Sequence, residues 1–260
     1  MSKTTRNVLS LGLFLVLMGL PSDAAELKQI QRRGHLIVAV KDNLRPLGFR
    51  DASGHLQGLE IDIAQRLAQD LLGSSSAVVL KPVANRDRLS VVLEGKVDLA
   101  IAEVAATTSR FRLVNFSIPY YTTGTGLITK DTKIHQLSNL INRKVAVLNG
   151  SSTIANLRFI LPSVQMVGVS SYQEAQMLLD AGKASAFAGD INVLTGWVQQ
   201  TPGYYLLPSR LSTQPLAIVL PKGLQYEALR GQINQIIGRW QLEGWLRKRI
   251  QYWGLPSNKL

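Results

Sequence analysis

Strand-like and helix-like segments alternate along most of this chain, and this alternation restricts the fold more than any other feature. Residues 59–72 carry apolar side chains every three to four positions and are followed by Gly73, a typical end signal for a helix. Strands that alternate with helices pair in parallel, because each connection crosses one face of the sheet. We therefore predict an α/β fold. The predicted strands are 35–41, 77–83, 97–102, 124–129, 144–148, 164–169, 184–188, 204–207 and 216–220, and the predicted helices are 59–72, 85–93, 152–161, 171–181, 226–252 and one that begins at Ile191.

A weak internal repeat indicates two similar halves. Gly95–Glu103 aligns without gaps to Gly182–Asp190, and each segment follows the apolar end of a helix. In both segments a buried strand is expected to end on a carboxylate. Ligands of open α/β sheets bind beyond the carboxyl ends of the strands, so two facing halves would share one cleft. Chance similarity between strands of small residues is the alternative interpretation of the repeat taken alone.

Residues 1–25 have the composition of a secretory signal peptide. Lys3 and Arg6 precede the uncharged, mostly apolar run Val8–Leu20, and small residues follow up to Ala25. That run is too short to span the roughly 30 Å hydrocarbon core of a bilayer as a helix. We therefore expect cleavage near residue 25 and export to the periplasm, with a retained N-terminal anchor as the alternative.

Composition excludes several classes of chemistry. The chain has no cysteine, which excludes disulfides, thiol nucleophiles and thiolate metal ligands. Its three histidines lack the spacing of metal ligands, and the sequence contains neither a phosphate-binding loop nor a nucleophile elbow. We predict no metal, no cofactor and no catalytic residues.

The formal net charge of +12 suggests nucleic acid as a partner. The basic residues, however, are scattered along the chain and are not interleaved with aromatic residues, so we predict no nucleic-acid binding.

The remaining polar groups suit recognition of a zwitterion. Hydroxyl groups and a guanidinium in 107–110 follow the strand that ends at Glu103, and a hydroxyl-rich segment, 150–153, follows the corresponding strand of the second half. Free N–H groups at a helix start, together with an arginine, bind carboxylates. Asp190 would bind an ammonium group or cap the next helix. Each segment alone also fits an ordinary helix N-cap, and Lys41 and Arg86 alone also fit surface cations.

Several segments taken together resemble the bacterial solute-binding proteins of family 3. They are Gly58–Ala68, the dipeptide at 85–86, Gly95–Arg110 and Val114–Tyr121, which contains a Phe-Ser-x-Pro-Tyr motif. The similarity extends from about residue 34 to 254. It implies the type II periplasmic-binding fold, in which two α/β lobes are joined by two hinge strands. The implied lobes are 26–124 plus 213–260, and 125–212.

The resemblance also implies roles for particular residues. Arg110 would grip the α-carboxylate of an amino acid, aided by Thr107 and by N–H groups near Ala105, and Asp190 would take the α-ammonium. Lys41 and Arg86 would contact the ligand side chain. The contacts expected from the second lobe to the carboxylate are Ser152, with Ser151 and Thr153 beside it.

Two positions depart from the family pattern. Ala105 stands where the family usually has a threonine, and Glu103 stands where it commonly has a neutral residue such as asparagine. A carboxylate at position 103 would repel an acidic ligand, or would pair with Lys41 or Arg86 and cancel their charge. Glutamate, aspartate, glutamine, asparagine and cationic amino acids therefore all stay open as ligands.

The predicted function is that of a monomeric periplasmic receptor that delivers a polar amino acid to the inner-membrane permease of an ABC importer. Two alternatives stay open. One is a periplasmic dehydratase of the prephenate or arogenate type on the same fold, with Glu103 as general acid. The other is a sensor or interaction protein that has lost ligand binding, which the departures at Glu103 and Ala105 would permit.

Overall fold

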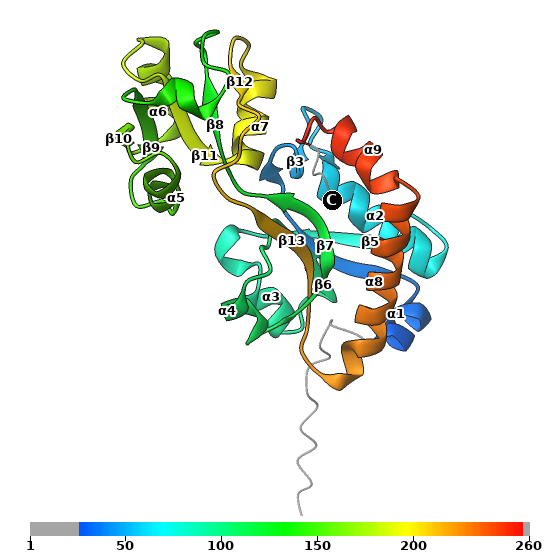
Figure 1. Cartoon of the computed structure of the whole chain (residues 1–260). Coiled ribbons are helices and arrows are strands. Elements are labelled where there is room, and N and C mark those ends of the chain that lie inside the picture. The colour runs from blue at the N-terminus through cyan, green and yellow to red at the C-terminus, as the bar shows by residue number, and fades with distance from the viewer. Residues whose placement is uncertain (1–25, 257–260) are drawn as a thin grey trace, which may run out of the picture.

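The computed structural model describes residues 26–256, and the predicted signal peptide, 1–25, lies outside the described residues. Two lobes are visible in Figure 1, each built on its own five-stranded sheet. The first lobe contains the sheet β5-β1-β6-β13-β7, and the second contains β10-β9-β11-β8-β12. Among residues 26–256, no helix is long and apolar enough to cross a membrane.

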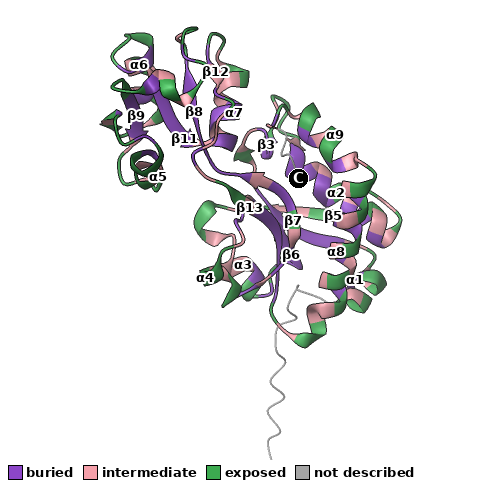
Figure 2. Ribbon diagram, in the orientation of Figure 1, coloured by how far each residue is buried: buried purple, intermediate pink, exposed green. Residues whose placement is uncertain are grey.

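The sheet of the first lobe is mixed. β1 pairs in parallel with β5 and β6, whereas β13 runs antiparallel to β6 and β7. Alternate side chains of its strands enter two cores, one under α1, α2, α8 and α9 and the other under α3. Figure 2 shows the buried strands between these helices. The elements are α1 (Leu27–Arg33), β1 (Leu36–Val40), α2 (Leu59–Leu72), β5 (Val78–Pro82), α3 (Ser90–Leu93), β6 (Leu99–Ile101), α4 (Thr108–Phe111), β7 (Asn115–Thr123), β13 (Gln214–Leu220), α8 (Glu227–Leu242) and α9 (Trp245–Tyr252).

The second lobe repeats this plan. β9 pairs in parallel with β10 and β11, and β8 runs antiparallel to β11 and β12. One face of the sheet packs on α5 and the other on α6 and α7. The elements are β8 (Thr125–Thr129), β9 (Lys144–Leu148), α5 (Thr153–Ile160), β10 (Gln165–Val169), α6 (Tyr172–Asp180), β11 (Ala186–Asp190), α7 (Ile191–Gln200) and β12 (Tyr205–Leu206).

The sequence repeat corresponds to one local structure that occurs twice. Gly95 and Gly182 both adopt positive φ, at 68° and 65°, directly after a helix. In each copy the following lysine donates its N–H back to the end of that helix, from Lys96 to Val91 at 2.9 Å and from Lys183 to Leu178 at 2.8 Å. The chain then enters β6 or β11, which hold equivalent places in the two sheets. The prediction of two similar halves is confirmed.

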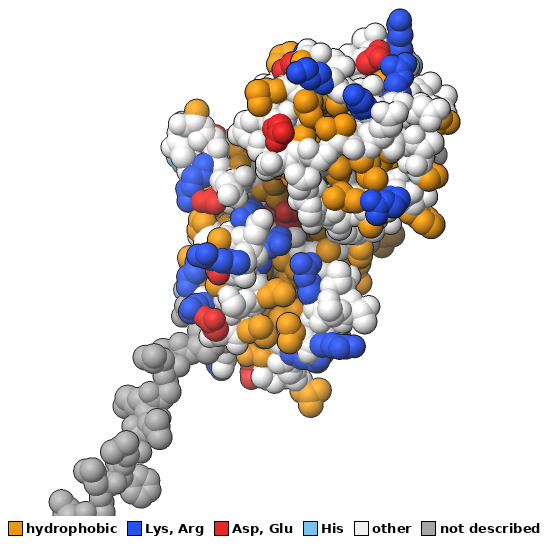
Figure 3. All heavy atoms as spheres, turned by 90° about the vertical axis from the view of Figure 1, so that its left-hand side faces the viewer, with side chains coloured by type: hydrophobic (Ala, Val, Ile, Leu, Met, Phe, Trp, Pro, Cys, Tyr) orange, Lys and Arg blue, Asp and Glu red, His pale blue; other side chains and the backbone are white. Residues whose placement is uncertain are grey.

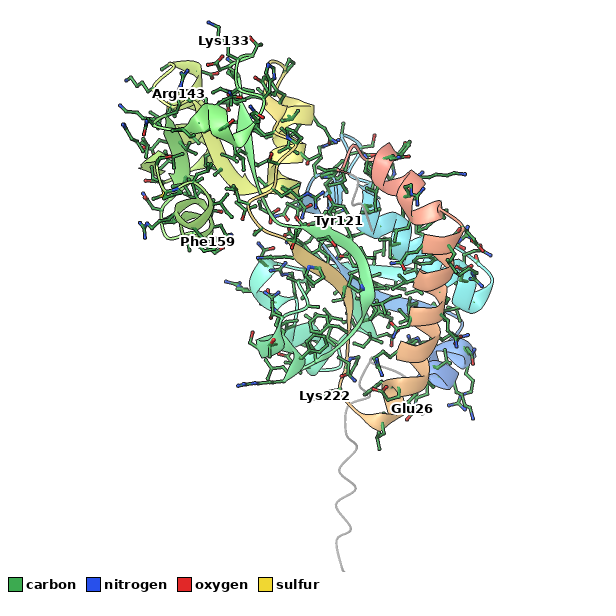
Figure 4. All side chains as sticks on the ribbon, viewed as in Figure 1. Glu26, Tyr121, Lys133, Arg143, Phe159 and Lys222 are labelled. Carbon is green, nitrogen blue, oxygen red and sulfur yellow. The ribbon has the colours of Figure 1, made fainter. Side chains whose placement is uncertain are left out.

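The chain crosses between the lobes twice, from β7 to β8 and from β12 to β13 (Figure 1). The two crossings lie side by side at Gly124, where an added Cβ would lie 1.9 Å from the carbonyl oxygen of Ser212. The Thr125 N–H donates to Ser212 Oγ at 3.0 Å. Tyr121, labelled in Figure 4, donates its hydroxyl to the Pro256 carbonyl at 3.3 Å, so the C-terminal segment also meets this region.

The structure differs from the predicted elements at several points. The predicted helix 226–252 is two helices, because Gly244 adopts φ 73° between α8 and α9. The predicted helix 85–93 is a 3-10 turn followed by α3, and β7 and α1 are additional elements. Part of the sheet is antiparallel rather than parallel. The remaining elements are a small sheet of β2 (Asn43–Leu44), β3 (Gly48–Arg50) and β4 (Leu56–Gln57), and the 3-10 helices Asn85–Asp87, Leu137–Leu140 and Leu224–Tyr226.

Candidate ligand-binding site

The carboxyl ends of the central strands of both lobes meet between the lobes. Glu103 follows β6 of the first lobe, and Asp190 ends β11 of the second and caps α7. The Asn192 amide joins the two sides, because its Nδ2 donates to Glu103 Oε1 at 3.1 Å and its backbone N–H donates to Asp190 Oδ1 at 2.8 Å. Figure 3 looks into the hollow between the lobes, where acidic and basic side chains lie. The facing halves therefore share one cleft.

Glu103 is held firmly in this cleft. Its backbone adopts φ 53°, which is uncommon for a residue with a Cβ. Its N–H donates to Glu60 Oε1 at 2.6 Å, and Arg88 Nη1 donates to its carbonyl at 2.6 Å. Burial raises the pKa of the Glu103 carboxyl to about 7, and the charge of Asp190 adds to the increase while the Asn192 amide opposes it. The pKa of Asp190 is also raised by burial, although N–H bonds at the start of α7 counteract this.

Glu60 is a buried carboxylate that the sequence analysis did not include in the site. It is fully buried in the first turn of α2, and its Oε1 also accepts the Tyr120 hydroxyl at 2.5 Å. Its Oε2 has no hydrogen-bond partner within residues 26–256, and burial raises its pKa. The signal was present in the sequence, since Glu60 lies on the apolar stripe that includes Ala64 and Leu67, where a charged residue is unusual.

Two cations of the first lobe lie beside these carboxylates. Lys41 is buried, with only 3% of its surface exposed, and its Nζ donates to the Val83 carbonyl at 2.9 Å. Burial lowers the pKa of Lys41, and the charge of Arg88 lowers it further. Arg88 Nη1 lies 3.8 Å from Glu103 Oε2.

The structure does not bring Arg86 to this cluster. The Arg86 side chain is 88% exposed and lies 3.5 Å from Asp87. Arg88, two residues further on, has a side chain only 16% exposed and occupies the position beside Glu103. Arg86 lies within the 3-10 turn Asn85–Asp87 and Arg88 directly follows it, and the two side chains have different surroundings. The sequence analysis had no signal that distinguished one arginine from the other.

Arg110, the predicted carboxylate ligand, lies in α4 and is partly buried. Its Nη1 donates to the Ala105 carbonyl at 2.8 Å, and it forms no ion pair with a carboxylate among the described residues. Ala105 bridges to Leu216 of β13 and is buried. Thr107 is exposed as the N-cap of α4, with its Oγ1 3.2 Å from Ser109 Oγ. The guanidinium therefore has donors available for an anion.

The hydroxyl-rich segment of the second lobe begins α5. Ser152 is the exposed N-cap residue and makes no capping bond with its side chain. Thr153 is buried, and Ser151 Oγ is buried without a hydrogen-bond partner in the described chain. No hydrogen bond joins residues 151–153 to Arg110 within residues 26–256, so their shared contact with a ligand carboxylate stays a prediction.

A cavity of about 440 Å³ lies between the first lobe and the faces of α6 and α7. Arg45 covers the Phe49 ring at 3.8 Å on one side, and Tyr172 and Trp197 make an edge-to-face pair on the other. Tyr172 lines this cavity, and its pKa is raised by burial and then by the charges of Asp190 and Glu103. No group of three or more metal-ligating side chains occurs among the described residues.

The fold and this cleft define a two-lobed α/β binding protein. Residues 36–256 match the family "Bacterial extracellular solute-binding proteins, family 3", and the chain belongs to that family. It is 33% identical over 195 residues to the glutamine-binding protein of Geobacillus stearothermophilus, covering 74% of each chain. It is 28% identical over 221 residues to the ABC transporter glutamine-binding protein GlnH of Bacillus subtilis, covering 84% of this chain and 80% of the relative.

A solved structure gives the same picture of the fold. The ancestral cationic amino acid solute-binding protein AncCDT-1 superposes with a TM-score of 0.74 at 25% identity, covering 87% of this chain and 98% of the other. AncCDT-1 is also described as a precursor of cyclohexadienyl dehydratase. The relatives reported by sequence are binding proteins, whereas this ancestor connects the fold with an enzyme. The predicted family and type II fold are thus confirmed.

Proposed function

We propose that this protein binds a polar amino acid in the cleft between its lobes and delivers it from the periplasm to the permease of an ABC importer. The observation that carries the proposal is the pair of opposite charges offered by the two lobes. Arg110 of the first lobe forms no ion pair with a described carboxylate, and Asp190 of the second lobe is bonded only to N–H groups of α7. An amino acid carries the complementary carboxylate and ammonium on one carbon atom.

Ligand binding would favour closure, because a zwitterion contacts both lobes fully only when they are together. A charge-assisted hydrogen bond contributes about 1.5–3 kcal/mol. Two or three such bonds would offset the cost of immobilisation and reach micromolar affinity, about −8 kcal/mol. Gly124 and Ser212, where the crossings adjoin, are the expected hinge, and 125–212 is the expected moving lobe.

The charges around the cleft favour a ligand with an uncharged side chain. Lys41 and Arg88 share this part of the cleft with the carboxyl groups of Glu60 and Glu103, whose raised pKa values keep them from cancelling the two cations completely. An acidic side chain would meet these carboxyl groups and a basic side chain would meet the two cations, so a neutral polar side chain fits best. Two relatives named as glutamine-binding proteins support glutamine as the first candidate.

Calorimetry on the mature protein tests this function. L-Glutamine, L-glutamate, L-arginine and L-cystine are titrated into the wild type and into Arg110→Ala. We expect at least one amino acid to bind with micromolar affinity, and Arg110→Ala to weaken it by about 100-fold, the loss of one or two charged hydrogen bonds. Arg112→Ala, an exposed arginine of the same segment, is the matched control and should bind normally. No binding by the wild type, or equal binding by Arg110→Ala, would refute the proposal.

Dehydration is a second candidate function, favoured by the Glu103 carboxyl, whose pKa of about 7 suits a general acid. AncCDT-1 supports the possibility at the level of ancestry. Incubation with prephenate and arogenate, followed by chromatography, distinguishes the two functions. We expect unchanged substrate, since a receptor returns its ligand intact. Product formation that Glu103→Gln abolishes would establish the enzyme instead.

A further inference from the structure

The C-terminal helices α8 and α9 expose two large side chains. Leu242, at the end of α8, is 91% exposed, and Tyr252, at the end of α9, is 68% exposed. Both helices lie on the side of the first lobe that faces away from the second lobe (Figure 1), and Figure 2 shows exposed residues along α9. A single exposed apolar residue is ordinary, so the groups beside it decide what this surface can bind.

Basic residues accompany these two side chains. Helix α9 contains three basic residues and no acidic residue. Two of them, Arg247 and Lys248, are exposed and form no ion pair within residues 26–256, whereas Arg249 is paired with Asp62 of α2. The surface therefore has a local excess of positive charge, which favours an anionic partner. We call Leu242, Arg247, Lys248 and Tyr252 the α8/α9 surface.

The residue pattern of α9 is that of an amphipathic helix at a membrane surface. Leu246 and Ile250 are buried on one face, four positions apart. Lys248 and Tyr252, also four positions apart, lie on the opposite face, since two residues correspond to about 200° of rotation. The Arg249 guanidinium lies 4.1 Å from the Tyr252 ring, so the ring and a cation are presented together. Basic residues beside large apolar side chains are typical of helices that lie in the interface of a bilayer.

A groove of about 370 Å³ lies beside this surface, where α9 packs on α2. Trp245 and Arg249 of α9 line it, together with Arg66 of α2 and Ser75. The Arg66 guanidinium lies 5.6 Å from the Trp245 ring, and Arg249 Nε donates to Asp62 Oδ2 at 2.8 Å. Guanidinium and hydroxyl groups bind phosphate oxygens, and tryptophan is common at the interface of bilayers. The groove thus offers room and donors for a phosphate headgroup.

We propose that the α8/α9 surface binds a membrane that contains anionic phospholipids. A bilayer offers in one plane the phosphates that Arg247 and Lys248 would meet and the acyl boundary that Leu242 and Tyr252 would enter. Two unpaired cations and two apolar side chains give weak, reversible binding rather than a permanent anchor. This inference goes beyond the proposed function, because it needs neither an amino acid nor the cleft. Such binding would concentrate the protein on the surface where a permease lies.

Flotation with lipid vesicles tests the proposal. Residues 26–260, which contain both lobes, are used so that the apolar run Val8–Leu20 cannot itself bind lipid. We expect binding to vesicles of equal parts phosphatidylglycerol and phosphatidylcholine, and none to phosphatidylcholine alone. The double variant Arg247→Gln, Lys248→Gln should bind about 30-fold more weakly, since each cation contributes about fivefold.

The matched control removes the same charge elsewhere on the first lobe. Lys28 and Arg32 are exposed and four positions apart on α1, and the double variant Lys28→Gln, Arg32→Gln should weaken vesicle binding by less than about threefold. An equal loss in both double variants would overturn the proposal, because general attraction of the positive protein would then explain the binding. Absence of binding by the wild type would also overturn it, and would leave amino-acid binding in the cleft unaffected.

Leu242→Ser distinguishes a membrane from an acidic protein as the partner. The substitution removes an exposed apolar side chain and no charge, so the fold should keep its melting temperature. We expect vesicle binding to weaken at least about fivefold, and any binding to poly-L-glutamate to stay the same. Unchanged vesicle binding in Leu242→Ser, with equally tight binding of the wild type to poly-L-glutamate, would indicate an acidic protein and overturn the assignment to lipid.

Discussion

At the scale of single residues, the electrostatics of the cleft are clearest at Glu103, whose pKa is raised to about 7 by burial and then by nearby charges. Its carboxyl group is partly buried, is affected by the charge of Asp190 and accepts a bond from Asn192 of the other lobe. The titratable groups that face it come from every adjoining element: Asp190, Arg88, Lys41, Glu60, Tyr120 and Tyr172. The ionisation of this one carboxyl group should therefore be measurable in the whole protein.

The pH dependence of stability tests that expectation. Because the pKa of Glu103 rises from 4.5 to about 7 on folding, the folded state binds the extra proton between these values. Its contribution to stability is fully present below about pH 4.5 and is lost as the pH rises through 7. We expect the melting temperature of the ligand-free wild type to fall relative to Glu103→Gln across this range, as measured by calorimetry. A constant difference between the two proteins from pH 4.5 to 8 would contradict the assignment.

Some residues of the candidate site could be predicted from the sequence, and the others could not, for physical reasons. Glu103 and Asp190 were predictable because a strand end fixes where its next side chain points. Arg88 was not distinguishable from Arg86, since the 3-10 turn that contains Arg86 and ends before Arg88 has no strong sequence signal. Glu60 was detectable as a charge on an apolar helix stripe, but its partners Tyr120 and the N–H of Glu103 are distant in sequence.

At the scale of elements, α7 carries much of the contact between the lobes. Gly196 approaches the first lobe so closely that an added Cβ would lie 2.6 Å from the Arg45 carbonyl oxygen. Nearby, Gln199 Nε2 donates to the Trp253 carbonyl at 2.7 Å. Only a residue without a side chain allows this approach.

Gly196→Ala should therefore hold the lobes apart. We expect weaker amino-acid binding by about tenfold, with a more extended particle in small-angle X-ray scattering in the presence of ligand. The added methyl group favours the helix itself by up to about 1 kcal/mol, so the second lobe should not unfold. Gly238→Ala in α8, where the added Cβ meets nothing within 4 Å, is the control. Unchanged affinity in Gly196→Ala would show that ligand binding does not depend on the contact between α7 and Arg45.

Helices and strands were predictable where the pattern of apolar residues within one short segment determines the element. The predicted bounds of 59–72 and 144–148 coincide with α2 and β9. β7 was missed because Pro119 and several polar residues interrupt its pattern, and it is a strand because β13 pairs along it. The antiparallel strands β8 and β13 depend on the chain crossing between lobes, which no window of sequence reveals.

At the scale of the whole molecule, the first lobe is discontinuous in sequence and the second is continuous. β8 to β12 follow one another without interruption, whereas β13 returns to lie between β6 and β7. Pairing of β13 with β6 and β7 is slow, because the long intervening loop loses entropy on closure before the stabilising contacts form.

Pulsed hydrogen exchange during refolding tests this difference. Amides of β9 and β11 should become protected before those of β13 and β7, because their partners are nearer in sequence. Mass spectrometry of peptides from the two sheets measures the order. Earlier protection of β13 than of β9 would contradict the expectation.

The place of β13 has a consequence for biosynthesis. A ribosome releases β7 well before β13, and during that interval β7 has no neighbour to pair with, since β13 alone links it to the rest of its sheet. The nascent polypeptide thus carries an unpaired β7 from residue 123 until residue 214 has been made, and this exposed strand invites aggregation unless a chaperone shields it.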